Sequence, residues 1–155
     1  MALLPPEDVS RLSHVESTAI DGIWAKPTVD MLLEAAGAAA FERLDALLPA
    51  CGYIRMRSEE GRVPFSRGYT PQGLGKEVFH LHLRQRGDAD EVFFRDYLKL
   101  HPALAAAYGR LKRALWKPYE HGRDGYAAAK GGFMQYVTSE AKQYFSQQQK
   151  QDAAH

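Results

Sequence analysis

The chain has 155 residues, enough for one domain with a sizeable hydrophobic core. Its 20 Lys and Arg against 19 Asp and Glu give a net charge of +1, which favours neither nucleic acid nor a membrane as partner. Cys51 is the only cysteine, so an internal disulfide is excluded. The sequence lacks a signal-peptide pattern and any apolar run of membrane-spanning length, so we expect a cytoplasmic protein.

The first half of the sequence predicts a sheet. Short apolar runs alternate with Gly and Pro up to about residue 88, a pattern typical of strands and turns. Pro5 and Pro6 favour a short helix over 7–12, ahead of an extended piece at 14–15. We expect a helix over 38–50, ended at Gly52, and strands over the ranges 28–33, 53–57, 63–69 and 76–84.

The second half predicts helices. Apolar residues at helical spacing indicate helices over 90–100, 102–116 and from about 123 onward. We therefore expect an α+β fold in a single domain, 1–145, with a sheet-rich part over 12–84 and a helical part over 88–145. The Gln-rich residues 146–155 are expected to form a disordered tail.

Three side chains in the predicted strands are candidates for chemistry. Asp30 stands in an apolar strand, where an unpaired acid is costly, so a metal ion or another cation is expected beside it. His80 and His82 flank Leu81, so both rings point to one face of their strand. Such a pair suits metal binding or acid–base catalysis, and a pair of hydrogen-bonded core histidines fits the pattern equally well.

Four sequence motifs resemble those of a known family. In chain order they are HVESTAIDGIWAKPTVDMLL at 14–33, HLHL at 80–83, FRDYLKLHPALAAAYGRLKRAL at 94–115 and GYAAAKGGFMQYV at 125–137. Together they are similar to the signatures of the GrpB family, in the same order. That family belongs by fold to the nucleotidyltransferase superfamily related to DNA polymerase beta. The resemblance therefore implies a nucleotidyltransferase-like mixed sheet packed by helices, and it implies the fold more strongly than the reaction.

The resemblance also implies roles for particular residues. Ser17 and Thr18 would grip a phosphate of a nucleoside triphosphate, although a simple helix N-cap fits them as well. Asp30 would hold a divalent metal, Mg²⁺ or Mn²⁺. His80 and His82 are added as metal ligands because of their spacing on one strand face. Further candidates for binding an anion are Lys26, Arg67 and Lys130, for which an exposed or ion-paired surface role is the alternative.

Two positions depart from the family pattern. Glu16 replaces the glycine of a Gly-Ser pair, and its carboxylate would repel a phosphate about 4 Å away by ~1 kcal/mol in water. Alternatively, Glu16 is itself a catalytic group or ligand beside Asp30 and the two histidines, or the site has decayed. Leu32 stands where a second metal-binding acid is expected, and Glu34, on the same strand face as Asp30, lies at twice the usual spacing.

Three functions therefore stay open. The first is a nucleotidyltransferase-like enzyme acting on a small anionic or nucleotide substrate. The second is an enzyme that uses Glu16, Asp30, His80 and His82 on a small molecule without a nucleotide. The third is a non-catalytic binding or accessory module. Because the N-terminal segment usual in the family is missing from this sequence, we expect uncovered apolar surface and a homodimer.

Overall fold

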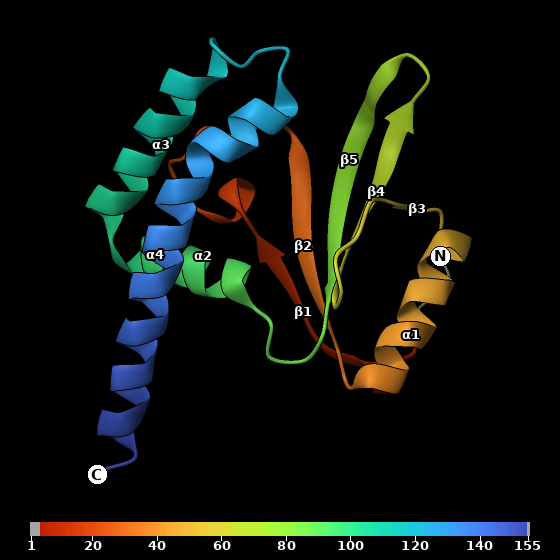
Figure 1. Cartoon of the computed structure of the whole chain (residues 1–155), viewed down its shortest axis with the longest axis horizontal. Coiled ribbons are helices and arrows are strands. Elements are labelled where there is room, and N and C mark those ends of the chain that lie inside the picture. Colours follow the sequence, from red (N-terminus) through yellow and green to blue (C-terminus); the bar gives the residue numbers. More distant parts are fainter. Residues whose placement is uncertain (1–3, 155) are drawn as a thin grey trace. The chain divides into compact units, whose positions relative to one another are not determined.

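The computed structural model describes residues 4–154, apart from the side chains of Leu74 and Arg123 (Figure 1). The chain divides into two compact units. The sheet unit contains the residues up to Ala19 together with Ala25–Ala89. The helical unit contains the short segment Ile20–Trp24 together with the chain from Asp90 onward. The change of character that the sequence predicts near residue 88 falls at this boundary.

The sheet unit is built on a mixed five-stranded sheet with the strand order β1-β2-β5-β4-β3. Strands β2 and β5 run parallel, and the other neighbouring pairs run antiparallel. The elements, in chain order, are η1 (Pro6–Asp8), β1 (Val9–Val15), η2 (Ser17–Ala19), β2 (Thr28–Ala35), α1 (Ala38–Leu47), η3 (Leu48–Cys51), β3 (Ile54–Arg55), β4 (Arg62–Thr70) and β5 (Gly73–Arg84).

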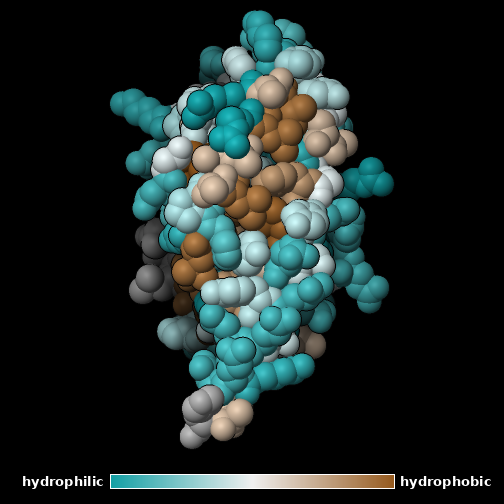
Figure 2. All heavy atoms as spheres, turned by 90° about the vertical axis from the view of Figure 1, so that its left-hand side faces the viewer, coloured by the Kyte–Doolittle hydropathy of each residue, from teal (hydrophilic) through white to brown (hydrophobic). Residues whose placement is uncertain are grey.

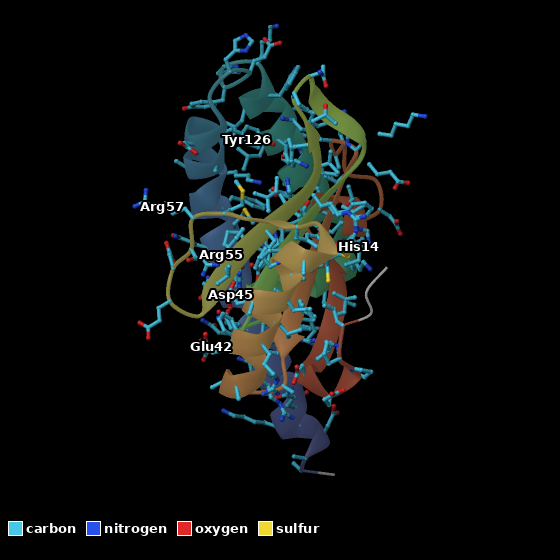
Figure 3. All side chains as sticks on the ribbon, turned by 90° about the vertical axis from the view of Figure 1, so that its right-hand side faces the viewer. His14, Glu42, Asp45, Arg55, Arg57 and Tyr126 are labelled. Carbon is cyan, nitrogen blue, oxygen red and sulfur yellow. The ribbon has the colours of Figure 1, made fainter. Side chains whose placement is uncertain are left out.

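One face of this sheet packs against α1. Because side chains alternate between the faces of a strand, every second residue of β2, β4 and β5 points to the helix. The resulting core contains Leu33, Ala35, Ala40, Phe41, Leu44, Leu48, Val63, Phe65, Leu81 and Leu83. Figure 3 looks at the unit from the side of α1, with His14 of β1 and Arg55 of β3 marking the two edges of the sheet. Arg55 donates to Asp45 of α1 at 2.8 Å and 3.1 Å, which ties the short β3 to the helix.

The beginning of the chain differs from the predicted helix over 7–12. Only the 3-10 turn η1 forms, and the chain then enters β1, which pairs antiparallel with β2. The carboxylate of Asp8 is buried and bonded to Arg43 of α1, which lowers the pKa of Asp8 below its usual value. The carbonyl of Asp8 accepts the N–H of Ala36 at 2.8 Å. Pairing with a distant strand thus overrides the local helix signal of the two prolines.

The helical unit consists of α2 (Asp90–Leu100), α3 (Pro102–Trp116) and α4 (Arg123–Asp152), together with Ile20–Trp24. Its core contains Ile20, Phe94, Leu98, Ala105, Tyr108 and Val137. The long α4 continues through Asp152, where a disordered tail was predicted from residue 146. Gln, Lys and Ala propagate a helix well once it has begun, and the N–H of Ala153 still bonds to Gln149.

Lys112 holds the segment Ile20–Trp24 in the helical unit. Its side chain is 5% exposed, and its ammonium donates to the carbonyl of Trp24 at 2.9 Å. The same nitrogen lies 5.8 Å from the ring centre of Trp24 and 5.7 Å from that of Tyr108. These contacts compensate part of the cost of burying an ammonium group.

Figure 2 shows one face of the molecule, on which hydrophilic side chains cover the part nearest the C-terminal end of α4. Hydrophobic side chains gather farther up the same face. Within residues 4–154, no helix is both long enough and apolar enough to cross a membrane.

Candidate functional site

Asp30, His80 and His82 lie together on the face of the sheet opposite α1. The parallel pairing of β2 and β5 sets Asp30 directly opposite His80 and Leu32 opposite His82. One carboxylate oxygen of Asp30, Oδ1, is 3.1 Å from Nδ1 of His80 and 3.5 Å from Nε2 of His82. The side chains are 17%, 19% and 24% exposed, respectively. The second distance is at the upper limit for a hydrogen bond, so the bond to His80 is the stronger one.

The carboxyl group of Asp30 is held in its ionised form. Burial raises its pKa, but hydrogen bonds from His80 and His82, and the attraction of their positive charge when protonated, outweigh this effect. The net result lowers the pKa of Asp30 from 3.8 to about 2. Near neutral pH the group is therefore a carboxylate, which accepts hydrogen bonds but donates none.

An ionised acceptor fixes the tautomer of each neutral imidazole. His80 must carry its proton on Nδ1 and His82 on Nε2, since each of these atoms faces Asp30. The opposite nitrogen of each ring then carries a lone pair. Within the sheet unit, no described residue hydrogen-bonds to Nδ1 of His82. His82 therefore presents a basic nitrogen whose ring is oriented by Asp30.

Tyr69 adds a fourth side chain that the sequence did not single out. Its hydroxyl lies 2.9 Å from Nε2 of His80, and the two rings are within 13° of parallel. Because Nε2 carries the lone pair of neutral His80, the hydroxyl of Tyr69 is the donor. A hydrogen-bonded chain thus runs from Tyr69 through His80 to Asp30.

A β-bulge directs Tyr69 to this position. Ser66 lies opposite His80 and Arg67 opposite Phe79, but the register then shifts, and Tyr69 lies opposite Leu74. Strict alternation would put Tyr69 on the same face as Arg67, away from His80. Gly68 has φ of 96°, a left-handed conformation that favours glycine. An isolated glycine inside a predicted strand is a sequence signal for such a bulge.

The second acid of a two-metal centre is not formed. Leu32, at the expected position, is fully buried and apolar. Glu34 is 4% exposed and bonds to the guanidinium of Arg11, and it accepts the backbone N–H of Gly87 at 3.2 Å. Among the described residues, no group of three or more His, Cys, Asp or Glu side chains is arranged to hold a metal ion. The donors do not fit a two-metal centre, and metal binding stays a prediction.

The turn with Ser17 and Thr18 directly follows β1. Val15, the last residue of β1, pairs with Asp30 of β2. Glu16 and the turn η2 follow Val15 directly, so they begin beside Asp30 along the sheet. Glu16 has φ of 62°, the left-handed region, so a glycine would be the natural residue there. Ser17 is buried, and Thr18 bonds through Oγ1 to Nε2 of His14 at 2.8 Å.

The three predicted anion-binding cations are placed differently. Lys26 is exposed in the segment before β2. Arg67 is exposed on the opposite face from His80, and its guanidinium lies 5.8 Å from the ring centre of Tyr53. Lys130 belongs to α4 in the helical unit, with its ammonium 5.3 Å from the ring centre of Tyr126. Arg67 therefore does not join the cluster around Asp30.

The described residues define an α+β protein with a five-stranded mixed sheet and four α-helices, which carries an acid–histidine cluster on one sheet face. Over residues 1–140 the sequence matches the family model described as GrpB protein. The chain belongs to the GrpB family, as its motifs predict.

The chain is similar to UPF0157 protein YqkA of Bacillus subtilis, with 29% identity over 140 residues that cover 88% of this chain and 40% of that protein. It is also similar to a UPF0157 protein of Pseudomonas aeruginosa, with 36% identity over 122 residues, 77% of this chain and 50% of that protein. The chain thus spans half or less of the length of these two relatives.

The crystal structure of conserved protein GrpB from Enterococcus faecalis has a similar fold, with a TM-score of 0.75 and 28% identity. The match covers 92% of this chain and 86% of that one.

Proposed function

We propose that this protein is an acid–base enzyme that acts on a small anionic molecule at the cluster of Asp30, His80 and His82. The observation that carries the proposal is one ionised carboxylate shared by two imidazoles. An imidazole oriented by a carboxylate exchanges protons near neutral pH, which is the usual design of a general base. In this proposal His82, with its lone pair on Nδ1, takes a proton from the substrate, and Asp30 stabilises the imidazolium that forms.

The charge of the substrate is inferred from the surroundings of the cluster. Because Asp30 is ionised, protonation of His82 makes the pair neutral, so the positive charge that would attract an anion must come from neighbouring residues. Lys26 is an exposed cation in the segment that leads into β2, two residues before that strand begins. The backbone of the turn at Ser17 and Thr18 would supply further hydrogen-bond donors.

Nucleotidyl transfer is the second candidate. It is favoured by the turn at Ser17 and Thr18, because this turn follows the residue pair Val15–Asp30 closely and could hold a phosphate near Asp30. Against it, the position of a second metal ligand is the buried Leu32, and Glu34 is bonded to Arg11. We therefore rank it below metal-independent acid–base chemistry.

A ligand titration separates the two candidates. Thermal unfolding is measured with inorganic phosphate, pyrophosphate and small dicarboxylates, and with nucleoside triphosphates in the presence and absence of Mg²⁺ or Mn²⁺. We expect a small anion to raise the melting temperature without a metal, and His82→Asn to abolish this rise. His121→Asn, at an exposed histidine of the helical unit, is the matched control. If only nucleoside triphosphate together with a metal stabilises the protein, and His82→Asn leaves this stabilisation unchanged, the proposal is overturned in favour of nucleotidyl transfer.

A further inference from the structure

We infer that Tyr69 is the reactive hydroxyl of this site: it takes a proton from the substrate as its own proton passes to Nε2 of His80, and Asp30 orients His80. The inference rests on the proposed function and adds a residue to it. A hydroxyl, an imidazole and a carboxylate joined by hydrogen bonds in this order form the arrangement by which proteins activate a weak nucleophile. The distances, 2.9 Å from Tyr69 to His80 and 3.1 Å from His80 to Asp30, are both within hydrogen-bond reach.

The solvent exposure of Asp30, His80 and Tyr69 fits a reactive role for the hydroxyl. Asp30 and His80 are 17% and 19% exposed, whereas Tyr69 is 40% exposed. The proton acceptor is thus shielded, and the hydroxyl that it serves is open to an incoming molecule. A hydroxyl that only stabilised the fold would gain little at such an exposed position, because water competes for its hydrogen bond.

The backbone is specialised to place this hydroxyl. A Cβ on Gly68 would lie 1.9 Å from the carbonyl oxygen of Glu77, and one on Gly75 would lie 2.5 Å from the carbonyl oxygen of Gly68. Both distances are shorter than any real contact of a Cβ, so β4 and β5 approach here more closely than side chains allow. Two glycines therefore permit the bulge that turns Tyr69 toward His80. Bulges that redirect one side chain are common beside active sites.

The imidazoles of His80 and His82 then have different roles in proton transfer. His80 is joined to Tyr69, so the phenol takes a proton from the substrate as it passes its own proton to Nε2 of His80. His82 is bonded to Asp30 alone among the described residues of the sheet unit, and it accepts a proton at Nδ1. One shared carboxylate thus orients two bases, His82, which acts directly, and His80, which acts through the phenol of Tyr69.

Reactivity toward phenylsulfonyl fluoride tests the inference without a known substrate. The phenol oxygen attacks sulfur, the S–O bond forms, the S–F bond breaks with loss of fluoride, and the phenol proton passes to Nε2 of His80. Tyr136, on α4, is the internal control, because it is 60% exposed and accessibility alone would make it react faster than Tyr69. Mass spectrometry of peptides from the intact, folded protein measures both rates.

We expect Tyr69 to be modified about tenfold faster than Tyr136, as activation by a neighbouring base predicts. His80→Gln should remove this preference, and Asp30→Asn should reduce it. Acidification of the wild-type protein, which protonates the imidazole, should remove it as well, so the test does not depend on the folding of a variant. Modification of Tyr69 no faster than that of Tyr136, at a rate that His80→Gln leaves unchanged, would overturn the inference.

The two proposals fail separately. If Tyr69 shows no preference while His82→Asn abolishes stabilisation by a small anion, the role of Tyr69 is wrong and the proposed function stands. If Tyr69 is activated through His80 but no small anion stabilises the protein, the activation stands and the proposed substrate class is wrong.

Discussion

Gly68 faces the carbonyl oxygen of Glu77 across β4 and β5 so closely that a Cβ on the glycine would lie 1.9 Å from that oxygen. The contact is between two backbones, so neither partner can rotate away as a side chain would. Gly68 also has φ of 96°, which other residues adopt at a cost of ~1 kcal/mol or more. This single position links the stability of the hairpin to the placement of Tyr69.

We therefore predict that Gly68→Ala destabilises the protein by about 2–4 kcal/mol, through strain at positive φ and overpacking against Glu77. The free energy of unfolding in urea measures the effect. Gly132→Ala in α4 is the control, since a Cβ there meets no atom within 4 Å and should stabilise the helix by up to ~1 kcal/mol. Equal effects of the two substitutions would contradict the close approach at the bulge.

Asp30 predicts a dependence of stability on pH. Its pKa is lowered in the folded state, so its stabilisation is complete above the unfolded value of 3.8 and is lost as the pH falls toward about 2. The full contribution is about 2 kcal/mol, of which about 1 kcal/mol should be lost by about pH 3. The test compares the wild-type protein with Asp30→Asn in urea at about pH 5 and about pH 3. A difference between the two proteins that is the same at both pH values would contradict the prediction.

The left-handed backbone of Glu16 leads us to predict that a glycine variant is more stable than an alanine variant. Its φ of 62° favours glycine, and both Glu16→Gly and Glu16→Ala remove the carboxylate. We expect the glycine variant to be more stable than the alanine variant by ~1 kcal/mol, the cost of a left-handed conformation for a residue with a Cβ. Urea unfolding measures this difference, and a more stable alanine variant would be the contrary result.

The same two variants test the charge of Glu16. If its carboxylate repels phosphate, both variants should bind pyrophosphate more tightly than the wild-type protein, as calorimetric titration would detect. Weaker binding in both variants would instead indicate that Glu16 takes part in the site.

We predict that the hydrogen bond from Lys112 to the carbonyl of Trp24 retains the segment Ile20–Trp24 in the helical unit. Lys112→Met keeps the apolar stem but removes the ammonium bonded to the carbonyl of Trp24, and should cost about 1.5–3 kcal/mol. Hydrogen exchange should then show faster exchange in the segment Ile20–Trp24. Lys130→Met is the control, since the described contact of that ammonium is with the ring of Tyr126 and is worth about 0.5–1 kcal/mol. Unchanged exchange in this segment would show that Lys112 does not hold it.

Much of the sheet face could be predicted because alternation along a strand is a local property. The spacing of His80 and His82 puts both rings on one face, and β5 confirms it. The helices at 90–100 and 102–116 also agree with α2 and α3, since their apolar spacing and the break at Pro102 are local signals.

The predicted helix over 7–12 was wrong because a local signal competed with pairing to a distant strand. Proline at the first position permits a helix, but β1 gains backbone hydrogen bonds along β2 that a single short helix would not supply. The strand expected over 53–57 is shortened to Ile54–Arg55 for a related reason, as its partner β4 pairs with it at only two positions.

By itself, the sequence determined the family, the α+β class and the face that each histidine occupies, because motifs and periodicity are carried by neighbouring residues. Only the tertiary structure decided that β2 lies parallel to β5, which brings Asp30 to His80 across 50 positions of the chain. It also decided that Glu34 bonds to Arg11 and that the bulge at Gly68 turns Tyr69 to His80. Strand register depends on the contacts of residues far apart in the chain, and no local pattern encodes them.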